Sequence, residues 1–588
     1  MTTTMSSDFD LASAHARYSK PTRKKAAGAT YTPAELALFL ADAALAAYKI
    51  PAEGQIRVLD PAVGDGALLD ALLQRLPEDV LCRVEVTGFD TNPQAIEAAK
   101  CRLEKWPVEK FIFHETDFLS FVITDFGQQT LFSSAASAGF NIVIANPPYV
   151  RTQVLGADAA QVLAKQFGLT GRVDLYYPFL LGISRVLAPD GVASVIVSNR
   201  FMTTKSGQAV RSALLSTYDL LHVWDLGDTK LFDAAVLPAV ILARCRGQGA
   251  SKPTNSIQLT TIYETDQPAN NLAQGILNAV AIRQSGTYSL PDGRRFNIQC
   301  GVLDNGGIDE GLWRVATAHT DDWLATVTKN TWRPFRSIGK IRVGVKSTAD
   351  KVFLRSDWND LQEGRPELLK PLITRHSARQ FKAKLPEKAS KRKEILYPHE
   401  ATASGRKAVD LSDYPISFAY LNSHRQVLEA RTYVIEAGRQ WYELWVPQDP
   451  AAWSQPKLVF PDISDEPVFW MDLDGGVVNG ECYWLKADDP SDGDLLWLAL
   501  AVANSSFIKA FYDHSFNNKL YAGRRRFITQ YVEQFPLPDP KRNITQEIIQ
   551  LAKRIYSTIP FSDANALIAE LDEKVWEVFG LGSEEVAR

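Results

Sequence analysis

The tetrapeptide Asn146-Pro147-Pro148-Tyr149 carries the clearest chemical signal in this chain. It ends the apolar run Phe140 to Ala145, which is typical of a buried strand. Two consecutive prolines fix two φ angles and remove two backbone donors, so nearby carbonyls stay available as acceptors. Beside an Asn amide and an aromatic ring, these acceptors would form a cage for a planar group bearing an NH2, such as an amide or an adenine. An ordinary turn is the alternative, because Asn-Pro and Pro-Pro are common turn signals.

A glycine loop precedes this tetrapeptide in the sequence. The segment Val58 to Leu69 is typical of a strand, a loop with Gly64 and Gly66, and the start of a helix. Glycines let the backbone approach a ligand closely, and a helix N-terminus favours anionic groups. A plain dinucleotide fold is the alternative interpretation, although the loop lacks the third glycine of that motif.

Acidic residues end two further predicted strands. Asp90 follows the run Val84 to Phe89, where an acid suits ribose hydroxyls. Asp117 and Phe118 follow Phe111 to Phe113 and would suit the amino group and the face of an adenine. Four strand ends in this order predict a nucleotide-type site beside the Asn-Pro-Pro-Tyr cage.

These segments together resemble the gamma class, or TaqI-like group, of DNA adenine-N6 methyltransferases from restriction–modification systems. The resemblance is strong over residues 28–245 and looser beyond, through Ile341 to Lys346 and Arg524 to Pro538. It implies a Rossmann-like α/β sheet that uses S-adenosylmethionine, followed by a mixed α+β DNA-recognition domain. The segments that match the family are Gly28 to Pro33, Asp60 to Gly66, Asp90, Asp117-Phe118, Asn146 to Tyr149, Asp174 to Tyr176, Gly191 to Asn199 and Lys230 to Phe232.

The resemblance assigns roles to individual residues. Catalysis falls to Asn146, Pro147, Pro148 and Tyr149, with Tyr149 and Phe232 stacking on a flipped-out base. No metal is expected. The residues implied to bind S-adenosylmethionine are Thr30, Tyr31, Thr32, Pro33, Asp60, Pro61, Ala62, Gly64, Gly66, Asp90, Asp117 and Phe118.

The implied reaction is methyl transfer to N6 of an adenine in double-stranded DNA. The expected setting is a type II system that protects host DNA, with a monomeric enzyme and, where one exists, a separately encoded restriction endonuclease. Two basic clusters are candidate DNA contacts in a chain whose net charge is only −4. They comprise Arg375, Arg379, Lys391, Arg392 and Lys393, and then Arg524, Arg525 and Arg526.

Composition adds bounds to this interpretation. Apolar residues make up 46% and charged residues 22% of the 588 residues, which is ordinary for a globular protein of two or three domains. Five scattered cysteines without a CxxC pair indicate a reducing cytosol. The resemblance implies that this is the cytoplasm of a bacterium or archaeon. None of the cysteines follows a proline, which argues against a cytosine-C5 methyltransferase. No apolar run reaches the length of a membrane span.

The expected organisation has five parts along the chain. They are a disordered arm over 1–27, a catalytic domain over 28–250, a bridging region over 251–330, a target-recognition domain over 331–540 and C-terminal helices over 541–588.

Other functions compete with DNA methylation. Protein glutamine methyltransferases carry the same Asn-Pro-Pro-Tyr turn, and an RNA base methyltransferase is a further alternative. A catalytically silent DNA-reading subunit would not need the intact site motifs. A fused nuclease is suggested formally by Pro538-Asp539 with Asp572-Glu573-Lys574, but the latter three residues fall in a predicted amphipathic helix.

Overall fold

The computed structural model describes residues 32–126, 139–149, 161, 163, 165–169, 174–231, 237–246, 256–388, 391–403, 405–516, 520, 524–559 and 562–582. The chain forms two compact units. The first comprises residues 1–317 with 519–523, and the second comprises 318–518 with 524–588. The expected arm over 1–27 lies outside the described residues.

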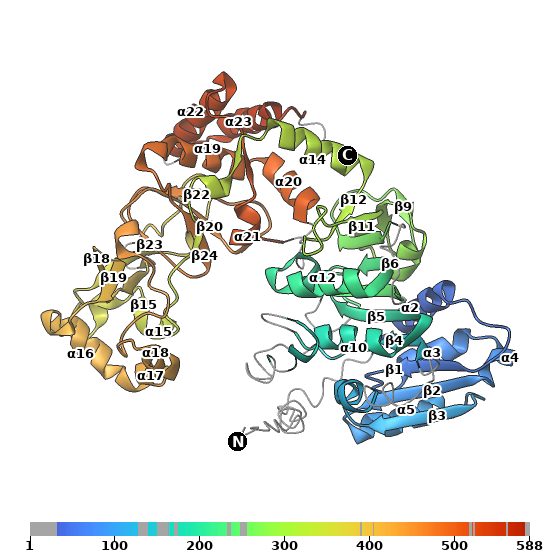
Figure 1. The fold of residues 1–588 in the computed structure, drawn as a ribbon. Coiled ribbons are helices and arrows are strands. Elements are labelled where there is room, and N and C mark those ends of the chain that lie inside the picture. The colour runs from blue at the N-terminus through green and yellow to red at the C-terminus, as the bar shows by residue number, and fades with distance from the viewer. Residues whose placement is uncertain are drawn as a thin grey trace, which may run out of the picture. The chain divides into compact units, whose positions relative to one another are not determined.

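The first unit is built on a twelve-stranded sheet (Figure 1). Strands β3, β2, β1, β4 and β5 are parallel, in that spatial order. Strand β7 is antiparallel between β5 and β6, and β8, β11, β10 and β9 extend the sheet, with β12 beside β11. Strand bounds are β1 Ile56–Asp60, β2 Val84–Asp90, β3 Lys110–Glu115, β4 Phe140–Ala145, β5 Leu187–Ser198, β6 Tyr218–Asp225, β7 Pro238–Cys245, β8 Gln258–Glu264, β9 Asn271–Leu272, β10 Gly286–Ser289, β11 Arg295–Asp304 and β12 Arg314–Ala316.

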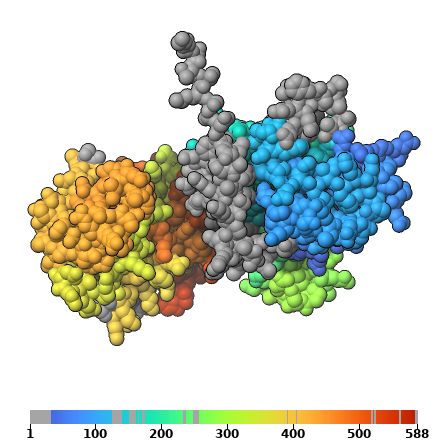
Figure 2. All heavy atoms as spheres, turned by 90° about the horizontal axis from the view of Figure 1, so that it is seen from below, coloured from blue at the N-terminus to red at the C-terminus, as the bar shows by residue number. Residues whose placement is uncertain are grey.

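Helices cover both faces of the parallel part of this sheet. Neighbouring strand residues therefore serve two cores: Val58 packs in one and Leu59 in the other. This explains why β1 and β4 are apolar runs without alternation. The β1–β3 region is the blue body of Figure 2. Helix bounds are α2 Ala34–Ala47, α3 Ala67–Arg75, α4 Glu78–Leu81, α5 Pro93–Leu103, α6 Phe118–Phe121, α10 Tyr176–Val186, α11 Arg200–Thr203, α12 Gln208–Thr217 and α13 Ile276–Ala281.

The expected bridging region over 251–330 needs correction. Strands β8 to β12 pair within the first sheet, and β8 joins it directly through β6. The unit boundary lies between Thr317 and Ala318, so the first unit extends well past the Gly- and Ser-rich segment near residue 250. Gly-, Ser- and Pro-rich composition occurs both between domains and within one domain, which is why composition alone misplaces this boundary.

The second unit contains two four-stranded sheets around an aromatic core. One sheet has the order β14-β24-β20-β22 and the other β15-β17-β16-β23. Their shared core contains Trp358, Trp453, Trp470 and Trp484. Strand bounds are β13 Arg333–Pro334, β14 Arg342–Val343, β15 Leu354–Arg355, β16 Leu369–Ile373, β17 Glu394–Leu396, β18 His399–Thr402, β19 Gly405–Ala408, β20 Lys457–Pro461, β21 Ile463–Ser464, β22 Trp470–Asp472, β23 Val477–Val478, β24 Cys482–Leu485, β25 Arg525–Arg526 and β26 Pro536–Leu537.

Helices α19, α22 and α23 pack together at one end of this unit (Figure 1). Within the described ranges, no single helix is long and apolar enough to cross a membrane; the pair Pro490–Ala503 and Ser506–Phe516 meets that criterion only jointly, across a 77° bend. Helix bounds are α14 Ala318–Asn330, α15 Asp350–Phe353, α16 Pro415–Ser423, α17 Arg425–Glu429, α18 Thr432–Glu436, α19 Gly493–Ala503, α20 Ser506–Phe516, α21 Thr529–Val532, α22 Asn543–Thr558 and α23 Asn565–Val578.

Candidate active site

The carboxyl ends of β1, β2, β3 and β4 lie at one edge of the sheet, because these strands are parallel. The chain order reverses between β1 and β4, and ligands of open α/β sheets bind at such a point. Asp60 ends β1, Asp90 ends β2, and Asn146 follows β4 directly. The fold thus gathers candidate residues that are separated in the sequence.

The glycine loop is held against the end of β2. Asp90 accepts a hydrogen bond from the Gly64 amide at 3.1 Å, and the Val63 amide donates to the Phe89 carbonyl at 2.8 Å. Gly64 and Gly66 have φ of +52° and +81°, which favours glycine. A Cβ on Gly66 would lie 3.2 Å from the Ala99 Cα, whereas one on Gly64 would meet nothing within 4 Å. Gly66 is therefore needed for close packing of the loop, whereas the backbone at Gly64 is open for a ligand to approach.

Asp60 is a deeply buried acid at this edge. It is 1% exposed, and its Oδ1 accepts from the Ala62 amide at 3.0 Å, while its Oδ2 has no hydrogen-bond partner among the described residues. Burial raises the pKa of Asp60 to about 8, with smaller contributions in the same direction from Asp90 and Asp65. Burial also raises the pKa of the half-buried Asp90. This arrangement favours a positively charged ligand group beside Asp60.

The pair Asp117-Phe118 divides between two roles. Asp117 caps α6 by accepting from the Ser120 amide at 2.7 Å. Phe118 is 1% exposed and packs against Phe89 and Phe179, at ring centroid distances of 5.7 Å each. The expectation that the Phe118 ring covers an adenine face is corrected here, because that ring belongs to the core in this structure.

The amide of Asn146 is oriented by Thr32. Its Nδ2 donates to the Thr32 Oγ1 at 3.1 Å, across 114 residues of sequence. Its Oδ1 is buried and accepts no hydrogen bond from any described residue. A buried acceptor without a donor costs free energy, on the order of 1–3 kcal/mol. The site therefore holds an amide oxygen that is ready to accept from an incoming N–H group.

The other three residues of the tetrapeptide differ in burial. Pro147 is buried, and Pro148 and Tyr149 are half-buried. The Tyr149 ring packs edge-on near Tyr176, with centroids 6.2 Å apart. The Tyr149 hydroxyl is also buried without a partner among the described residues, and burial raises the pKa of this tyrosine.

The remaining candidates of the first unit lie as follows. Pro33 precedes α2 at its N-cap position, without a side-chain cap, so Thr32 contacts Asn146 instead of capping this helix. Pro61 is buried and Ala62 half-buried in the glycine loop. Thr30, Tyr31 and Phe232 lie outside the described residues.

A buried polar network lies beyond these motifs, and none of the motifs in the sequence predicts it. Asn199, which follows β5, donates to Asp225 Oδ1 at 2.8 Å, and the Tyr263 hydroxyl donates to Asp225 Oδ2 at 2.6 Å. Asp225 also accepts from the Gly227 amide at 3.1 Å. The network ties together the ends of β5, β6 and β8. Polar residues at the ends of the apolar runs in β5 and β6 are the signal that could have revealed it.

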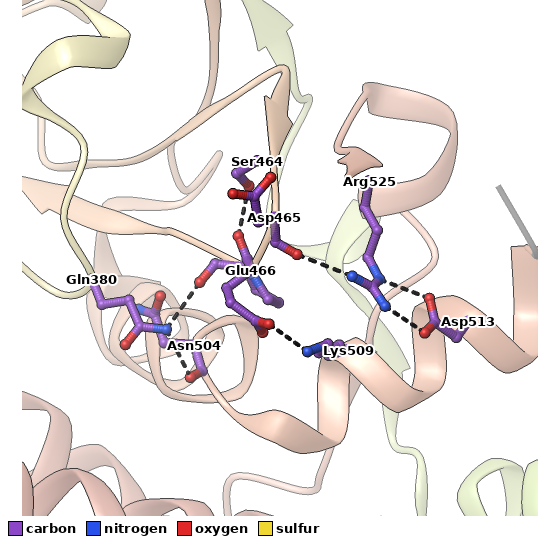
Figure 3. Close-up of polar contacts among 9 residues, drawn as sticks. Gln380, Ser464, Asp465, Glu466, Asn504, Lys509, Asp513 and Arg525 are labelled. Carbon is purple, nitrogen blue, oxygen red and sulfur yellow. Dashed lines mark hydrogen bonds and ion pairs between the residues drawn. The ribbon is translucent and has the colours of Figure 1, made fainter. Parts of the chain in front are cut away.

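All three residues of the cluster Arg524 to Arg526 form ion pairs within the second unit. This corrects the assignment of the buried Arg525 to DNA contact, whereas that of the exposed Arg524 and the half-buried Arg526 stays a prediction. Arg525 has a side chain only 7% exposed and forms a bidentate pair with Asp513 at 2.7 and 2.6 Å, besides donating to the Asp465 carbonyl (Figure 3). Arg526 pairs with Asp462 at 3.0 Å, and the more exposed Arg524 with Asp465 at 3.2 Å. Arg525 thereby fixes the turn after β21 to α20.

The other basic segment surrounds a hollow of about 710 Å³ in the second unit. Its lining carries six Lys or Arg residues against Glu387 alone. Arg375 itself lies outside this lining, 3.5 Å from Glu481. The lining cations are Arg379, Lys384, Lys388, Lys391, Arg392 and Lys393.

The formal nuclease motif has a structural role. Asp572 accepts from the Ser506 amide and from its hydroxyl, both at 2.6 Å, at the start of α20. Lys574 pairs with Glu547 at 2.7 Å. Among the described residues, no group of three or more His, Cys, Asp or Glu side chains could hold a metal ion.

Comparison with known proteins identifies both parts of the chain. Residues 85–232 match the Eco57I restriction-modification methylase family, and residues 384–537 match the TaqI-like C-terminal specificity domain. The type II methyltransferase M.BanIII of Aneurinibacillus aneurinilyticus is 36% identical over 545 residues, which cover 91% of this chain and 93% of the relative. The chain belongs to the TaqI-like methyltransferases of restriction–modification systems.

More distant relatives of this TaqI-like methyltransferase support the same family and fold. M.BstVI of Geobacillus stearothermophilus is 23% identical, covering 82% of this chain and 85% of the relative. A nuclease-deletion mutant of the type ISP enzyme LlaGI shares the fold at a TM-score of 0.53 and 11% identity, over 91% of this chain and 55% of that one. The expected methyltransferase sheet with a mixed C-terminal domain is thereby confirmed.

Proposed function

We propose that this methyltransferase transfers a methyl group from S-adenosylmethionine to N6 of a flipped-out adenine in double-stranded DNA. The observation that carries the proposal is the buried Oδ1 of Asn146 at the carboxyl edge of the sheet, which has no donor among the described residues. The setting is a type II system, in which the enzyme acts as a cytoplasmic monomer and protects host DNA from a separately encoded endonuclease.

The chain's own residues would act by accepting hydrogen bonds and by positioning. The exocyclic nitrogen of adenine is a poor nucleophile, because its lone pair is delocalised into the ring. The two N–H groups of this nitrogen would donate hydrogen bonds to the Asn146 Oδ1 and to the Pro147 carbonyl oxygen. These hydrogen bonds would localise the lone pair on nitrogen. The remaining requirement is alignment of nitrogen with the methyl group. A base inside a duplex must leave the stack, and stacking on Tyr149 would offset part of that cost.

Asp60, the Gly64 backbone, Asp90 and Asp117 are the residues suited to hold the cofactor. S-adenosylmethionine would supply an electrophilic methyl group on a sulfonium, a cation that suits the buried carboxyl of Asp60. Asp90 already organises the loop through Gly64, so it would hold ribose hydroxyls and loop together.

A protein amide or an RNA base would also fit an Asn-Pro-Pro-Tyr turn. DNA is favoured because the second unit matches a TaqI-like specificity domain and carries the basic hollow around Lys391 to Lys393. The test is incubation of the purified protein with S-adenosylmethionine and a duplex DNA library, followed by nucleoside analysis. N6-methyladenine is the expected product; methylation of protein or RNA alone would refute the proposal.

Removal of the carboxylate of either Asp90 or Asp117 should weaken S-adenosylmethionine binding. Asp90→Ala and Asp117→Ala each leave a ligand donor unpaired, so we expect dissociation constants about 5- to 150-fold higher, since an unpaired donor costs about 1–3 kcal/mol. Isothermal titration measures this. Asp79→Ala, at an exposed position of α4, is the matched control. Unchanged constants in both variants would place the cofactor elsewhere.

Neutralising Lys391, Arg392 and Lys393 together to Ala should weaken binding to every duplex. Phosphate contacts release counterions without reading sequence, so the log–log salt slope should flatten by about 0.9 for each phosphate that is no longer neutralised. Binding across a salt series checks this. The triple variant of Lys329, Lys541 and Arg554 removes equal charge from exposed positions elsewhere in the same unit. Equal slopes for both triples and the wild type would assign the hollow no DNA contact.

A further inference from the structure

A second, smaller hollow of the second unit differs in character from the basic one. Its volume is about 480 Å³, and two chain segments line it, one with residues 345–348 and Asp350, the other with residues 479–481. We name the strand-end loop Lys346-Ser347-Thr348, together with Asn479-Gly480-Glu481, the paired loops. The sequence shows only a loose family resemblance up to Lys346, which gives this place no function.

The paired loops meet through closely packed backbone. Val345 forms a bridge with Asn479, and the Val345 amide donates to the Val478 carbonyl at 2.7 Å. A Cβ on Gly344 would lie 2.1 Å from the Asn479 carbonyl oxygen, and one on Gly480 would lie 2.7 Å from the Val345 carbonyl oxygen. Only glycine fits at these two positions without moving the backbone.

A buried arginine anchors the same loops. Arg431 is 5% exposed and donates to the Ser347 carbonyl at 2.8 Å, besides the carbonyls of Leu428, Trp441 and Glu443. Four backbone acceptors fix its guanidinium, which in turn fixes the loop. Side chains carried by such a platform are held in place for recognition.

Two residues at or near the paired loops have strained backbone conformations. Thr348 and Gln448 have φ of +59° and +62°, a region unfavourable for residues with a Cβ. Gln448 donates to the Val343 carbonyl at 2.7 Å, so it too supports the loop. Strain of this kind persists where surrounding structure over-determines it, and it concentrates at ligand sites.

The side chains at this hollow present donors and acceptors of both signs. Lys346, Thr348 and Glu481 are exposed, and Asp350 receives a hydrogen bond from Ser347. A phosphate clamp needs an excess of cations, which the basic hollow has and this one lacks. Base edges in the major groove present mixed donors and acceptors, which Lys, Asn, Thr and Glu side chains read.

The paired loops also lie next to the basic segment. Glu481 is 3.5 Å from Arg375, and the Asn479 amide donates to the Ile373 carbonyl at 2.9 Å, just before the basic segment begins. A DNA-reading surface combines phosphate contacts that set register with neighbouring groups that read bases. We infer that the paired loops read base edges of double-stranded DNA, with Lys346 and Glu481 as specificity-determining residues; this rests on the proposed function.

The test is methylation of a random duplex library by the full-length protein, with modified sites located by sequencing. Wild type should yield one defined motif. Lys346→Met and Glu481→Gln should each relax one base-pair position and lower kcat/KM on the wild-type site about 5- to 150-fold. Lys351→Met, which removes the same charge at an exposed neighbour on α15, should keep the motif.

Three outcomes separate the possible failures. Absence of DNA methylation by the wild type would overturn the proposed function itself. An unchanged motif in both loop variants would overturn base reading while leaving the proposed function intact. A uniform decrease across all sequences, like that expected of the Lys391 triple variant, would also overturn base reading, because it marks phosphate contact. Two independent variants and their thermal midpoints guard against a folding artefact.

Discussion

Asn146→Ala should lower the rate of methyl transfer about 10²–10³-fold while leaving S-adenosylmethionine affinity largely intact. The change removes a buried side-chain oxygen that has no donor among the described residues and is therefore free to accept from the substrate. A preorganised hydrogen-bonding group that acts on the transition state is worth on the order of 10²–10³-fold in rate. Single-turnover methylation of a cognate duplex measures the fall in rate, and isothermal titration measures the cofactor affinity.

Two companion variants separate chemistry from folding. Asn146→Asp keeps an acceptor oxygen and should retain more activity than Asn146→Ala. Thr32→Val removes the acceptor that holds Nδ2 at 3.1 Å, so the amide can turn and kcat should fall, whereas Thr32→Ser should restore it. Near-wild-type turnover in Asn146→Ala would refute the catalytic assignment, and equal rates for Thr32→Val and Thr32→Ser would remove Thr32 from it.

Much of the first unit could be predicted because its signals are local. Apolar runs, whose residues pack into the cores on both faces of the sheet, identify β1, β2 and β4. Because these strands are parallel, their carboxyl ends lie at one edge of the sheet, whatever sequence connects them. Asp60, Asp90 and Asn146 therefore stand at the carboxyl ends of neighbouring strands, at that edge of the sheet. The link from Thr32 to Asn146 spans 114 residues and depends on packing, so no local sequence pattern reveals it.

The errors arise where residue type does not determine environment. Phe118 is apolar enough for either a ligand face or a core, and its neighbours Phe89 and Phe179 decide for the core. The Arg524 to Arg526 cluster has the composition of a solvated DNA contact, but acids 12 to 64 residues away neutralise it. The lining of the basic hollow holds a single acid, so its positive character survives folding.

Asp60 should make cofactor binding depend strongly on pH. With a pKa of about 8 in the ligand-free protein, this carboxyl is mostly protonated below that pH. A bound sulfonium or ammonium favours the carboxylate, so binding should release a proton and strengthen as pH rises. At about pH 6, roughly two units below the pKa, about 1% is ionised, and the affinity should be about 100-fold lower than above about pH 8. Titrations in buffers of different ionisation enthalpy count the proton released.

The same residue should lower the stability of the ligand-free protein at high pH. The folded state holds a proton on Asp60 up to about pH 8, whereas the unfolded chain releases it near its ordinary pKa, so stability falls as pH rises between these values. Asp60→Asn removes the ionisable group and therefore this loss of stability at high pH. The ligand-free thermal midpoint of the variant at about pH 8 should exceed that of the wild type. Its cofactor affinity should be weaker and nearly independent of pH. A wild-type affinity that is flat from about pH 6 to about pH 8 would show that Asp60 is not the group that meets the cationic part of the cofactor.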